Sequence, residues 1–310
     1  QRQMCIRDRC GPTAVGKTAV SIKLAQKLNT EIISSDSMQI YRGMDIGTAK
    51  IRRGEMQGIR HHMIDIVEPC NEYSVSDYSN DALKIIEALF SENKVPLIVG
   101  GTGLYINSLI YKMDFNSSKK NEEIRSKYRN IFEEKGVDFL YNILVSKNSK
   151  IASTIEKNNV KRVVRALEIL DNSDEIRAFE DVKIFQDYKV NMYVLKMNRE
   201  ILYKNINKRV DLMINDGLIE EVEKLMKTGL TSEHQSMKAI GYRQILSYLE
   251  GGISKEDAIE LIKRDSRRYA KRQYTWFKRY DFSKWIDVEN KDVDKIVDML
   301  YNDIIANNID

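Results

Sequence analysis

Cysteine is scarce in this chain, which has three in 310 residues: Cys5, Cys10 and Cys70. They form no C-x-x-C pair and no zinc-finger spacing, and their odd number argues against a disulfide framework. No apolar run approaches the length of a membrane span. The first nine residues also lack the apolar core of a secretory signal. We therefore expect a cytoplasmic protein without a membrane segment.

Internal repeats and low-complexity tracts are absent as well. The chain is 42% hydrophobic and 31% charged, which is typical of a globular protein. Its length leaves room for one large domain, or for a domain that carries an insertion. The net charge is only +4, so the distribution of basic residues is more informative about nucleic-acid binding than their total.

The residues Gly11-Pro12-Thr13-Ala14-Val15-Gly16-Lys17-Thr18 fit the phosphate-binding P-loop pattern G-x-x-x-x-G-K-[ST]. The glycines let successive backbone N–H groups point at an anion, and Lys17 adds a positive charge. Thr18 offers a hydroxyl to Mg²⁺. A helix expected over residues 19–28 points its N-terminus at the same anion. The loop therefore predicts a bound phosphate together with Mg²⁺.

Short apolar stretches alternate with helical patterns along the chain. This alternation predicts an α/β, P-loop NTPase-like fold, in which helices flank a parallel sheet. We expect strands at 31–37, 64–67, 95–99, 190–197 and 285–288, and helices at 77–92, 200–228, 236–250 and 255–280. The P-loop, Asp36 and Thr102 each follow the end of a strand. Because ligands gather at the carboxyl ends of parallel strands, these residues should share one pocket.

Two segments depart from this pattern. Residues 1–10, which should supply the strand before the P-loop, contain three arginines and an aspartate and make a poor central strand. We favour a replaced N-terminus over a native strand that the sheet forces into place. Residues 114–188 are rich in Lys, Asn and Glu and show no good strand. We predict that they form a helical insertion within a core made of residues 1–113 and 189–310.

Basic residues are concentrated on two predicted helices. Residues 264–280 contain seven basic residues and one acid, and the seven basic positions, Arg268 and Arg272 among them, fall within an arc of roughly 140° on a helix. Tyr269, Trp276, Phe277 and Tyr280 lie opposite, where we expect them to anchor the helix. Residues 160–167 repeat this design on a smaller scale. Such stripes are commonly solvated, but an arc this poor in acid suits a polyanion, and we predict a nucleic-acid backbone there.

The residues themselves leave three functions open. A small-molecule kinase could use Asp36 to orient an acceptor hydroxyl. A nucleic-acid-stimulated ATPase is weakened, because no clear run of four apolar residues ends in Asp followed by Glu. In a transferase, the loop would hold a diphosphate leaving group while an RNA base attacks.

Seven motifs in order make the chain resemble the tRNA dimethylallyltransferases, also called tRNA isopentenyltransferases, of bacterial type. The motifs lie at residues 11–18, 34–50, 61–69, 99–105, 161–168, 241–244 and 267–277. The resemblance implies transfer of a dimethylallyl group from dimethylallyl diphosphate to N6 of the adenosine 3′-adjacent to the anticodon of tRNA. It implies the anticodon stem-loop and the diphosphate as partners, and we expect a monomer.

The resemblance also assigns roles to individual residues. The P-loop would hold the diphosphate with Mg²⁺, while Lys17, Thr18 and Arg209 neutralise the charge of the leaving group. Asp36 would be the general base. The positions that match tRNA contacts of the family are Asp36, Ser37, Met38, Gln39, Thr102, Arg125, Lys161, Arg162, Val163, Val164, Arg165, Lys238, Ala239, Ile240, Gly241, Tyr242 and Arg243.

Overall fold

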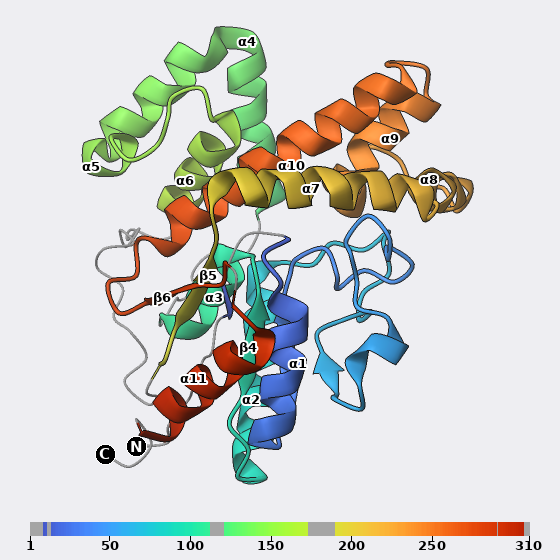
Figure 1. Ribbon diagram of the computed structural model, residues 1–310. Coiled ribbons are helices and arrows are strands. Elements are labelled where there is room, and N and C mark those ends of the chain that lie inside the picture. Colours follow the sequence, from blue (N-terminus) through green and yellow to red (C-terminus); the bar gives the residue numbers. More distant parts are fainter. Residues whose placement is uncertain (1–8, 11–13, 112–120, 173–189, 290, 307–310) are drawn as a thin grey trace. The chain divides into compact units, whose positions relative to one another are not determined.

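Six short strands form one parallel sheet in the computed structural model (Figure 1). The structure describes residues 9–10, 14–111, 121–172, 190–289 and 291–306. The strand order is β3-β2-β4-β1-β5-β6, and every neighbouring pair is parallel. The strands are β1 (Arg9–Cys10), β2 (Ile32–Ser35), β3 (His61–His62), β4 (Leu97–Gly100), β5 (Tyr193–Lys196) and β6 (Lys284–Asp287). The predicted parallel sheet is confirmed.

Helices α1 and α11 pack against this sheet, and α7 and α10 lie across its carboxyl end, where β5 leads into α7 (Figure 1). The α-helices are α1 (Lys17–Leu28), α2 (Val75–Ser91), α3 (Gly103–Ile110), α4 (Glu122–Lys147), α5 (Ser149–Ala152), α6 (Val160–Asn172), α7 (Arg199–Asn215), α8 (Leu218–Lys227), α9 (Tyr242–Leu249), α10 (Lys255–Phe277) and α11 (Val293–Ala306). Two short 3₁₀ helices are η1 (Arg53–Met56) and η4 (Ser236–Lys238).

Both faces of the sheet are buried. Ile32, Leu97 and Leu195 belong to one apolar core together with residues of α1 and α11. The next residues along two of these strands, Ile33 and Ile98, are fully buried as well. Because successive side chains of a strand point to opposite faces, the second face must also be covered. This double burial explains why the strands read as continuous apolar runs, and the predicted α/β class is confirmed.

The structure corrects three predicted elements. The single helix predicted over 236–250 is divided into η4 and α9, because Ala239 is extended and Gly241 has a φ of 98°. Residues 64–67 form no strand, because Met63 and Asp65 take the left-handed conformation with φ of 61° and 54°; β3 lies earlier, at His61–His62. The single helix predicted over 200–228 is divided into α7 and α8, because Gly217 has a φ of 100°. A glycine adopts that conformation without the steric cost that a Cβ brings, so the chain can turn there.

Strand β1 lies inside the sheet, between β4 and β5. Arg9 pairs with Val99 on one side and Tyr193 on the other, so these residues take the strand position despite their composition. Residues 1–8 lie outside the described part of the chain. The replacement of the N-terminus therefore stays a prediction.

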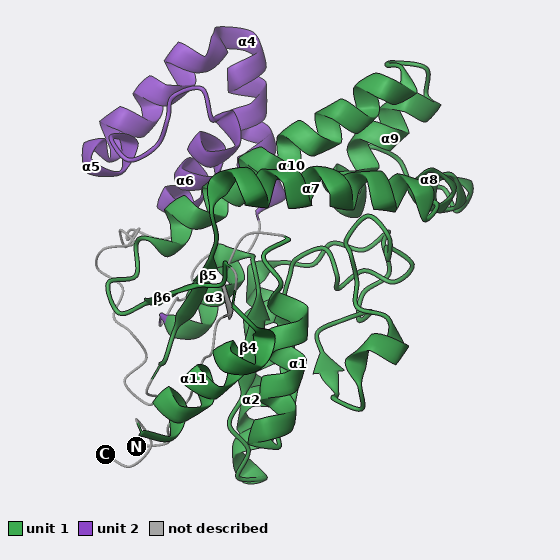
Figure 2. Ribbon diagram, in the orientation of Figure 1, with its two compact units in different colours: residues 1–110, 185–310 green, residues 111–184 purple. Residues whose placement is uncertain are grey.

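The chain divides into two compact units, residues 1–110 with 185–310 and residues 111–184 (Figure 2). The first unit contains the sheet. In the second unit, α4 and α6 share an apolar core that includes Tyr128, Leu140, Leu144, Val163 and Leu167. The insertion predicted from composition spans 114–188.

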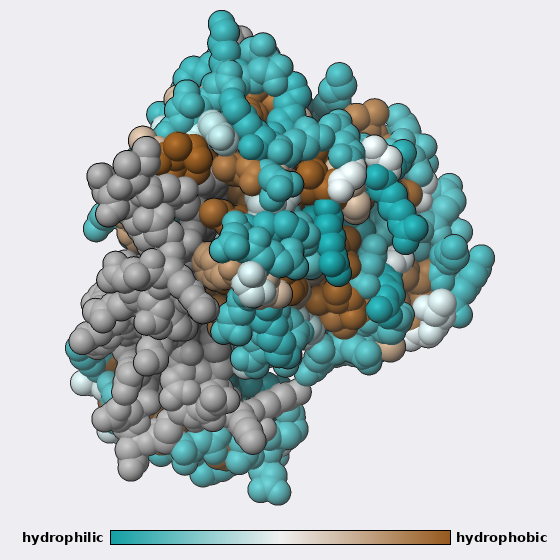
Figure 3. All heavy atoms as spheres, turned by 90° about the horizontal axis from the view of Figure 1, so that it is seen from below, coloured by the Kyte–Doolittle hydropathy of each residue, from teal (hydrophilic) through white to brown (hydrophobic). Residues whose placement is uncertain are grey.

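Hydrophilic residues cover most of the face shown in Figure 3 where described residues form it. Among the described residues, no helix is both long and apolar enough to cross a membrane.

A buried carboxylate organises the second unit. Glu168 on α6 has no exposed surface, and its oxygens accept hydrogen bonds from Arg165 at 2.7 Å, Arg125 at 2.8 Å and the backbone N–H of Asn121 at 2.8 Å. Burial alone would raise the pKa of Glu168. The donated hydrogen bonds outweigh burial and hold the pKa below its ordinary value.

We expect Glu168→Gln to destabilise the second unit by about 1.5–3 kcal/mol at pH 7, the range for hydrogen bonds to a charged group. A carboxylate with a lowered pKa contributes stability above the pKa of the unfolded chain and loses it as pH falls through the folded value. The difference between wild type and variant should therefore shrink below about pH 4.5, the ordinary pKa of the group. Hydrogen exchange of residues 121–172 across this pH range measures it. Glu134→Gln, at an exposed position of α4, is the control, and an equal effect of both variants would contradict the prediction.

Candidate active site

One cavity of about 780 Å³ lies in the first unit, at the carboxyl ends of the strands. Its volume is within the range of small-molecule sites. Ala14, Lys17 and Thr18 line it from the P-loop and α1. Ser34 lines it from β2, and residues 36–39 line it from the turn after β2. Residues 99–101 contribute from β4 and the turn behind it. Of the residues predicted to share one pocket, Asp36 and the described part of the P-loop line the cavity, whereas Thr102 does not.

The described part of the P-loop leads into the N-terminus of α1. Ala14 has a φ of 67° and Gly16 a φ of 89°, so the chain turns sharply before Lys17 begins the helix. The first turn of α1 carries no acidic residue. Its backbone N–H groups and the side chain of Lys17 therefore provide positive charge beside the cavity, as an anion requires. Gly11, Pro12 and Thr13 lie outside the described residues.

Asp36 immediately follows β2 and lines the cavity. Its Oδ1 accepts hydrogen bonds from the backbone N–H groups of Met38 at 2.9 Å and Gln39 at 3.4 Å. Thr102, after β4, fixes the same turn, because its Oγ1 accepts a hydrogen bond from the Ser37 N–H at 3.0 Å. Thr102 thus supports the turn that carries Asp36. It does not belong to the lining of the cavity.

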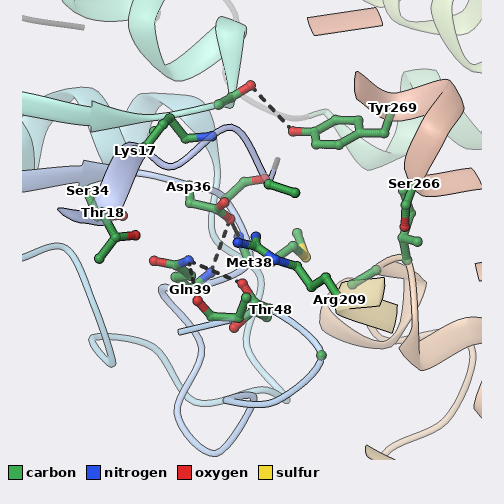
Figure 4. Close-up of a pocket in the computed structure, with 18 of the residues that line it drawn as sticks. Lys17, Thr18, Ser34, Asp36, Met38, Gln39, Thr48, Arg209, Ser266 and Tyr269 are labelled. Carbon is green, nitrogen blue, oxygen red and sulfur yellow. Dashed lines mark hydrogen bonds between the residues drawn. The ribbon is translucent and has the colours of Figure 1, made fainter. Parts of the chain in front are cut away.

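Arg209 enters the cavity from α7, and its guanidinium extends toward the space beside Asp36 (Figure 4). Burial lowers the pKa of Arg209 from its ordinary value. Removal of the guanidinium from water costs free energy, and a multiply charged anion in the cavity would compensate for that cost. Lys17, Asp36 and Arg209 come from three different elements and converge on one space (Figure 4).

Helix α10 forms a further wall through Ser266, Tyr269, Arg272 and Gln273. Arg272 stacks over the ring of Tyr269, 5.6 Å from its centroid. Burial and the charge of Asp36 raise the pKa of Tyr269 to about 12, so its hydroxyl stays protonated near neutral pH. The Gln273 amide donates to the Gly101 carbonyl at 3.0 Å and ties the helix to the turn after β4. The basic stripe and the cavity therefore meet at Arg272, while Arg268 is exposed.

The segment 238–243 contributes in several ways. Lys238, Ala239, Ile240 and Gly241 line the cavity. Tyr242 is fully buried. Arg243 is exposed and paired with Asp265 at 2.7 Å. Asp265 is the one acid of the basic stripe, and it also receives Arg264 at 3.2 Å, so part of the positive charge on this helix is neutralised.

The remaining predicted positions lie in the second unit. Lys161 and Arg162 are exposed on α6. Val163 and Val164 are buried in the core of that unit, so their side chains do not face solvent. Arg125 and Arg165 are both bound to Glu168. Two of the four basic side chains on this list thus have an acidic partner within their own unit.

Known proteins share both the sequence and the fold. The family model described as IPP transferase matches residues 39–280. A tRNA dimethylallyltransferase of Clostridioides difficile (strain 630) is 50% identical over 296 residues, which are 95% of this chain and 94% of that relative. One of Alkaliphilus oremlandii (strain OhILAs) is 50% identical over 284 residues, 91% of each chain. The chain belongs to the IPP transferase family.

Solved structures agree with this membership. A tRNA isopentenylpyrophosphate transferase from Bacillus halodurans superposes with a TM-score of 0.75 at 41% identity, covering 99% of this chain and 96% of that one. A eukaryotic dimethylallyltransferase, described as acting on tRNA, gives a TM-score of 0.85 at 30% identity, covering 99% and 80%. The family predicted from the seven motifs is confirmed, and with it the prediction of a prenyl-transferring enzyme.

Several cavity residues of this IPP transferase are missing from the sequence-based prediction. Ile206, Val210 and Met213 of α7 and Ile262 of α10 form an apolar part of the wall. Their spacing of three to four residues does mark one face of each helix. That spacing leaves open whether the face meets the sheet core or a cavity, because both are apolar.

The hydrogen bond between Ser37 N–H and Thr102 Oγ1 gives a direct test of how the turn is held. We expect Thr102→Val to destabilise the first unit by about 1–3 kcal/mol, because the Ser37 N–H is left without its acceptor in a half-buried turn. Thr102→Ser keeps the hydroxyl and should stay close to wild type. Urea unfolding measures both. Wild-type stability of Thr102→Val together with a loss in Thr102→Ser would show that the methyl group of Thr102, rather than its oxygen, stabilises the turn.

Proposed function

We propose that this protein transfers a dimethylallyl group from dimethylallyl diphosphate to N6 of the adenosine 3′-adjacent to the anticodon of tRNA. Family membership supports the reaction class, and the cavity supports the assignment of roles. The observation that carries the proposal is that Asp36, Lys17 and Arg209 line one cavity whose remaining wall is partly apolar. Such a cavity suits a substrate with a charged diphosphate end and a small hydrocarbon end.

The diphosphate would lie at the N-terminus of α1. Backbone N–H groups, Lys17 and Arg209 would surround it with positive charge. These groups interact more strongly with the diphosphate as it departs, because its negative charge grows while the allylic carbon becomes cationic. Interactions that strengthen in the transition state lower the barrier.

Mg²⁺ fits this donor set. Among the described residues, no group of three or more His, Cys, Asp or Glu side chains could hold a metal ion by itself. Mg²⁺ does not need such a cage, since it usually keeps several waters and binds through few protein oxygens together with substrate phosphates. The hydroxyl of Thr18 would be the protein ligand. The ion would supply further neutralisation of the diphosphate.

Asp36 would act as the general base. The adenine N6 attacks the allylic carbon, the new C–N bond forms as the C–O bond to diphosphate breaks, and one N6 proton passes to the Asp36 carboxylate. An exocyclic amine is a weak nucleophile, so removal of the proton during attack is useful. The base has to leave the anticodon loop to reach Asp36, which single-stranded RNA permits at low cost.

The hydrocarbon end would contact the apolar wall made by α7 and α10. Ile206, Val210, Met213 and Ile262 lie in the cavity lining, and they exclude water from the reacting carbon. Exclusion of water matters here, because water would otherwise compete with the amine for an allylic cation.

The family comparison disfavours the two alternatives raised by the P-loop alone. A small-molecule kinase would require phosphoryl transfer, and an RNA-binding ATPase would require hydrolysis. Phosphoryl transfer or ATP hydrolysis without transfer of the prenyl group would refute the proposal.

We expect Asp36→Asn to lower the rate of prenyl transfer by about 10²- to 10⁴-fold, the usual contribution of a general base. An asparagine keeps an oxygen for the Met38 and Gln39 N–H groups, so binding of the stem-loop should be retained. Radiolabelled dimethylallyl diphosphate and an anticodon stem-loop measure both quantities. Glu87→Gln, at an exposed position of α2, is the matched control. Full activity of the Asp36 variant would contradict the role of the carboxylate.

The basic face of α10 gives a second prediction. If Arg268 and Arg272 contact RNA phosphates, changing both to Ala should weaken tRNA binding and reduce the slope of log K against log salt by about 0.7–0.9 per lost contact. Replacing Lys291 and Lys295 by Ala removes the same charge at exposed positions in and just before α11. That control should leave the slope unchanged. Equal slopes for all three proteins would mean that the arginine face is only solvated.

A further inference from the structure

Glu221 on α8 holds the loop 45–50, although some 174–176 residues separate the partners. One of its oxygens accepts hydrogen bonds from the backbone N–H groups of Asp45 at 3.0 Å and Ile46 at 2.8 Å. The other accepts from the Gly47 N–H at 3.2 Å and from the Tyr242 hydroxyl at 2.5 Å. A single carboxylate thus binds four donors. It joins two segments that both line the cavity, residues 47–49 and 238–241.

Gly47 packs closely against Tyr242 and Leu218 where Glu221 binds the loop. A Cβ placed on Gly47 would lie 2.5 Å from the ring of Tyr242 and 2.9 Å from Leu218, so only glycine fits. Tyr242 has no exposed surface, and burial together with Glu221 raises its pKa. The phenol therefore stays protonated and continues to donate. The loop 45–47 is fixed by geometry as well as by charge.

The next residues of this loop fix Gln39. Its Nε2 donates to the backbone carbonyls of Thr48 at 3.2 Å and Ala49 at 3.4 Å (Figure 4). Only the NH₂ group of the amide can donate to two carbonyl oxygens, so the orientation of the Gln39 side chain is determined. Gln39 therefore offers the cavity a hydrogen-bond acceptor, its Oε1, while its donors are used by the loop.

Asp36 and Gln39 each contribute an acceptor oxygen to the lining of the cavity. Asp36 is a carboxylate, and Gln39 presents a carbonyl oxygen. A purine with a 6-amino group donates to such oxygens, whereas a 6-oxo group would place one lone pair against another. This arrangement would select adenine over hypoxanthine, provided that Gln39 cannot turn its amide.

We propose that Glu221 is a positioning residue for base selection: through the loop 45–49 it keeps the Gln39 amide from flipping, and so keeps its oxygen toward the exocyclic amine. The inference rests on the proposed function, because it assumes that an adenine enters this cavity. Glu221 itself would contact neither the prenyl diphosphate nor the tRNA. Loss of Glu221 should therefore change discrimination between bases more than it changes the chemistry.

The test compares two anticodon stem-loops that differ only at the target base, adenosine or inosine. Wild-type enzyme should bind the inosine stem-loop about tenfold or more weakly, as expected for loss of a good base contact. In Glu221→Ala this ratio should fall toward one, and Glu221→Gln, which keeps an acceptor oxygen, should restore part of it. Competition of each stem-loop against labelled prenyl transfer measures the ratio.

Controls separate positioning from general destabilisation. Glu223→Ala removes an exposed carboxylate from the same helix and should keep the wild-type ratio. Should Glu221→Ala fail to fold, Tyr242→Phe removes one of the four hydrogen bonds and should lower the ratio partway. A folded Glu221→Ala enzyme with the wild-type ratio overturns the inference and leaves the proposed function intact. A wild-type protein that transfers no prenyl group overturns the proposed function itself.

Discussion

Two parallel strands approach so closely at their carboxyl ends that the position of Asp36 follows from them. A Cβ on Gly100 would lie 2.3 Å from the Ser35 Oγ and 2.5 Å from its carbonyl carbon, so β4 needs a glycine where it pairs with Ser35. Because the strands end at the same level, the Thr102 N–H reaches the Ser35 carbonyl at 3.0 Å. The Thr102 hydroxyl then holds the turn after Asp36. The carboxylate of the site is therefore fixed by backbone geometry rather than by a partner side chain.

Positively charged groups line the cavity beside this fixed carboxylate. Lys17 and Arg209 come from helices on different sides of the cavity, and the N-terminus of α1 adds its partial positive charge. Burial lowers the pKa of Arg209, because removal of its guanidinium from water costs free energy. A diphosphate would remove that cost on binding. Backbone N–H groups of Met38 and Gln39 hold the Asp36 carboxylate, which is compatible with the general-base role that we propose for it.

Local patterns predicted the parts of this site that depend on neighbouring residues. The P-loop spacing indicates a turn before α1, and the strand-end position of Asp36 indicates the pocket. Parts that depend on distant residues could not be predicted in this way. Glu221 binds the loop 45–47, and Glu168 takes up two arginines of the second unit. Glu221 lies 174–176 residues from that loop, and Arg125 lies 43 residues from Glu168, so the chain carries no local signal for these contacts. The Arg165–Glu168 contact is local, at i,i+3. The strand wrongly predicted at 64–67 has another cause, because the chain takes the left-handed conformation at Met63 and Asp65.

Selection of a base requires acceptors that do not rotate, and the loop 45–50 shows how irregular backbone can provide them. Glu221 holds its first half. Lys50, whose side chain is 4% exposed, holds its end by donating to Asp45, to Asp65 and to the Tyr41 carbonyl. A buried ammonium with three oxygen partners resists displacement, since loss of any one leaves charge uncompensated. With both halves fixed, the carbonyls of Thr48 and Ala49 stay in place. The amide of Gln39 is then oriented before the substrate arrives, and preorganisation of this kind lowers the free energy that binding must supply for ordering.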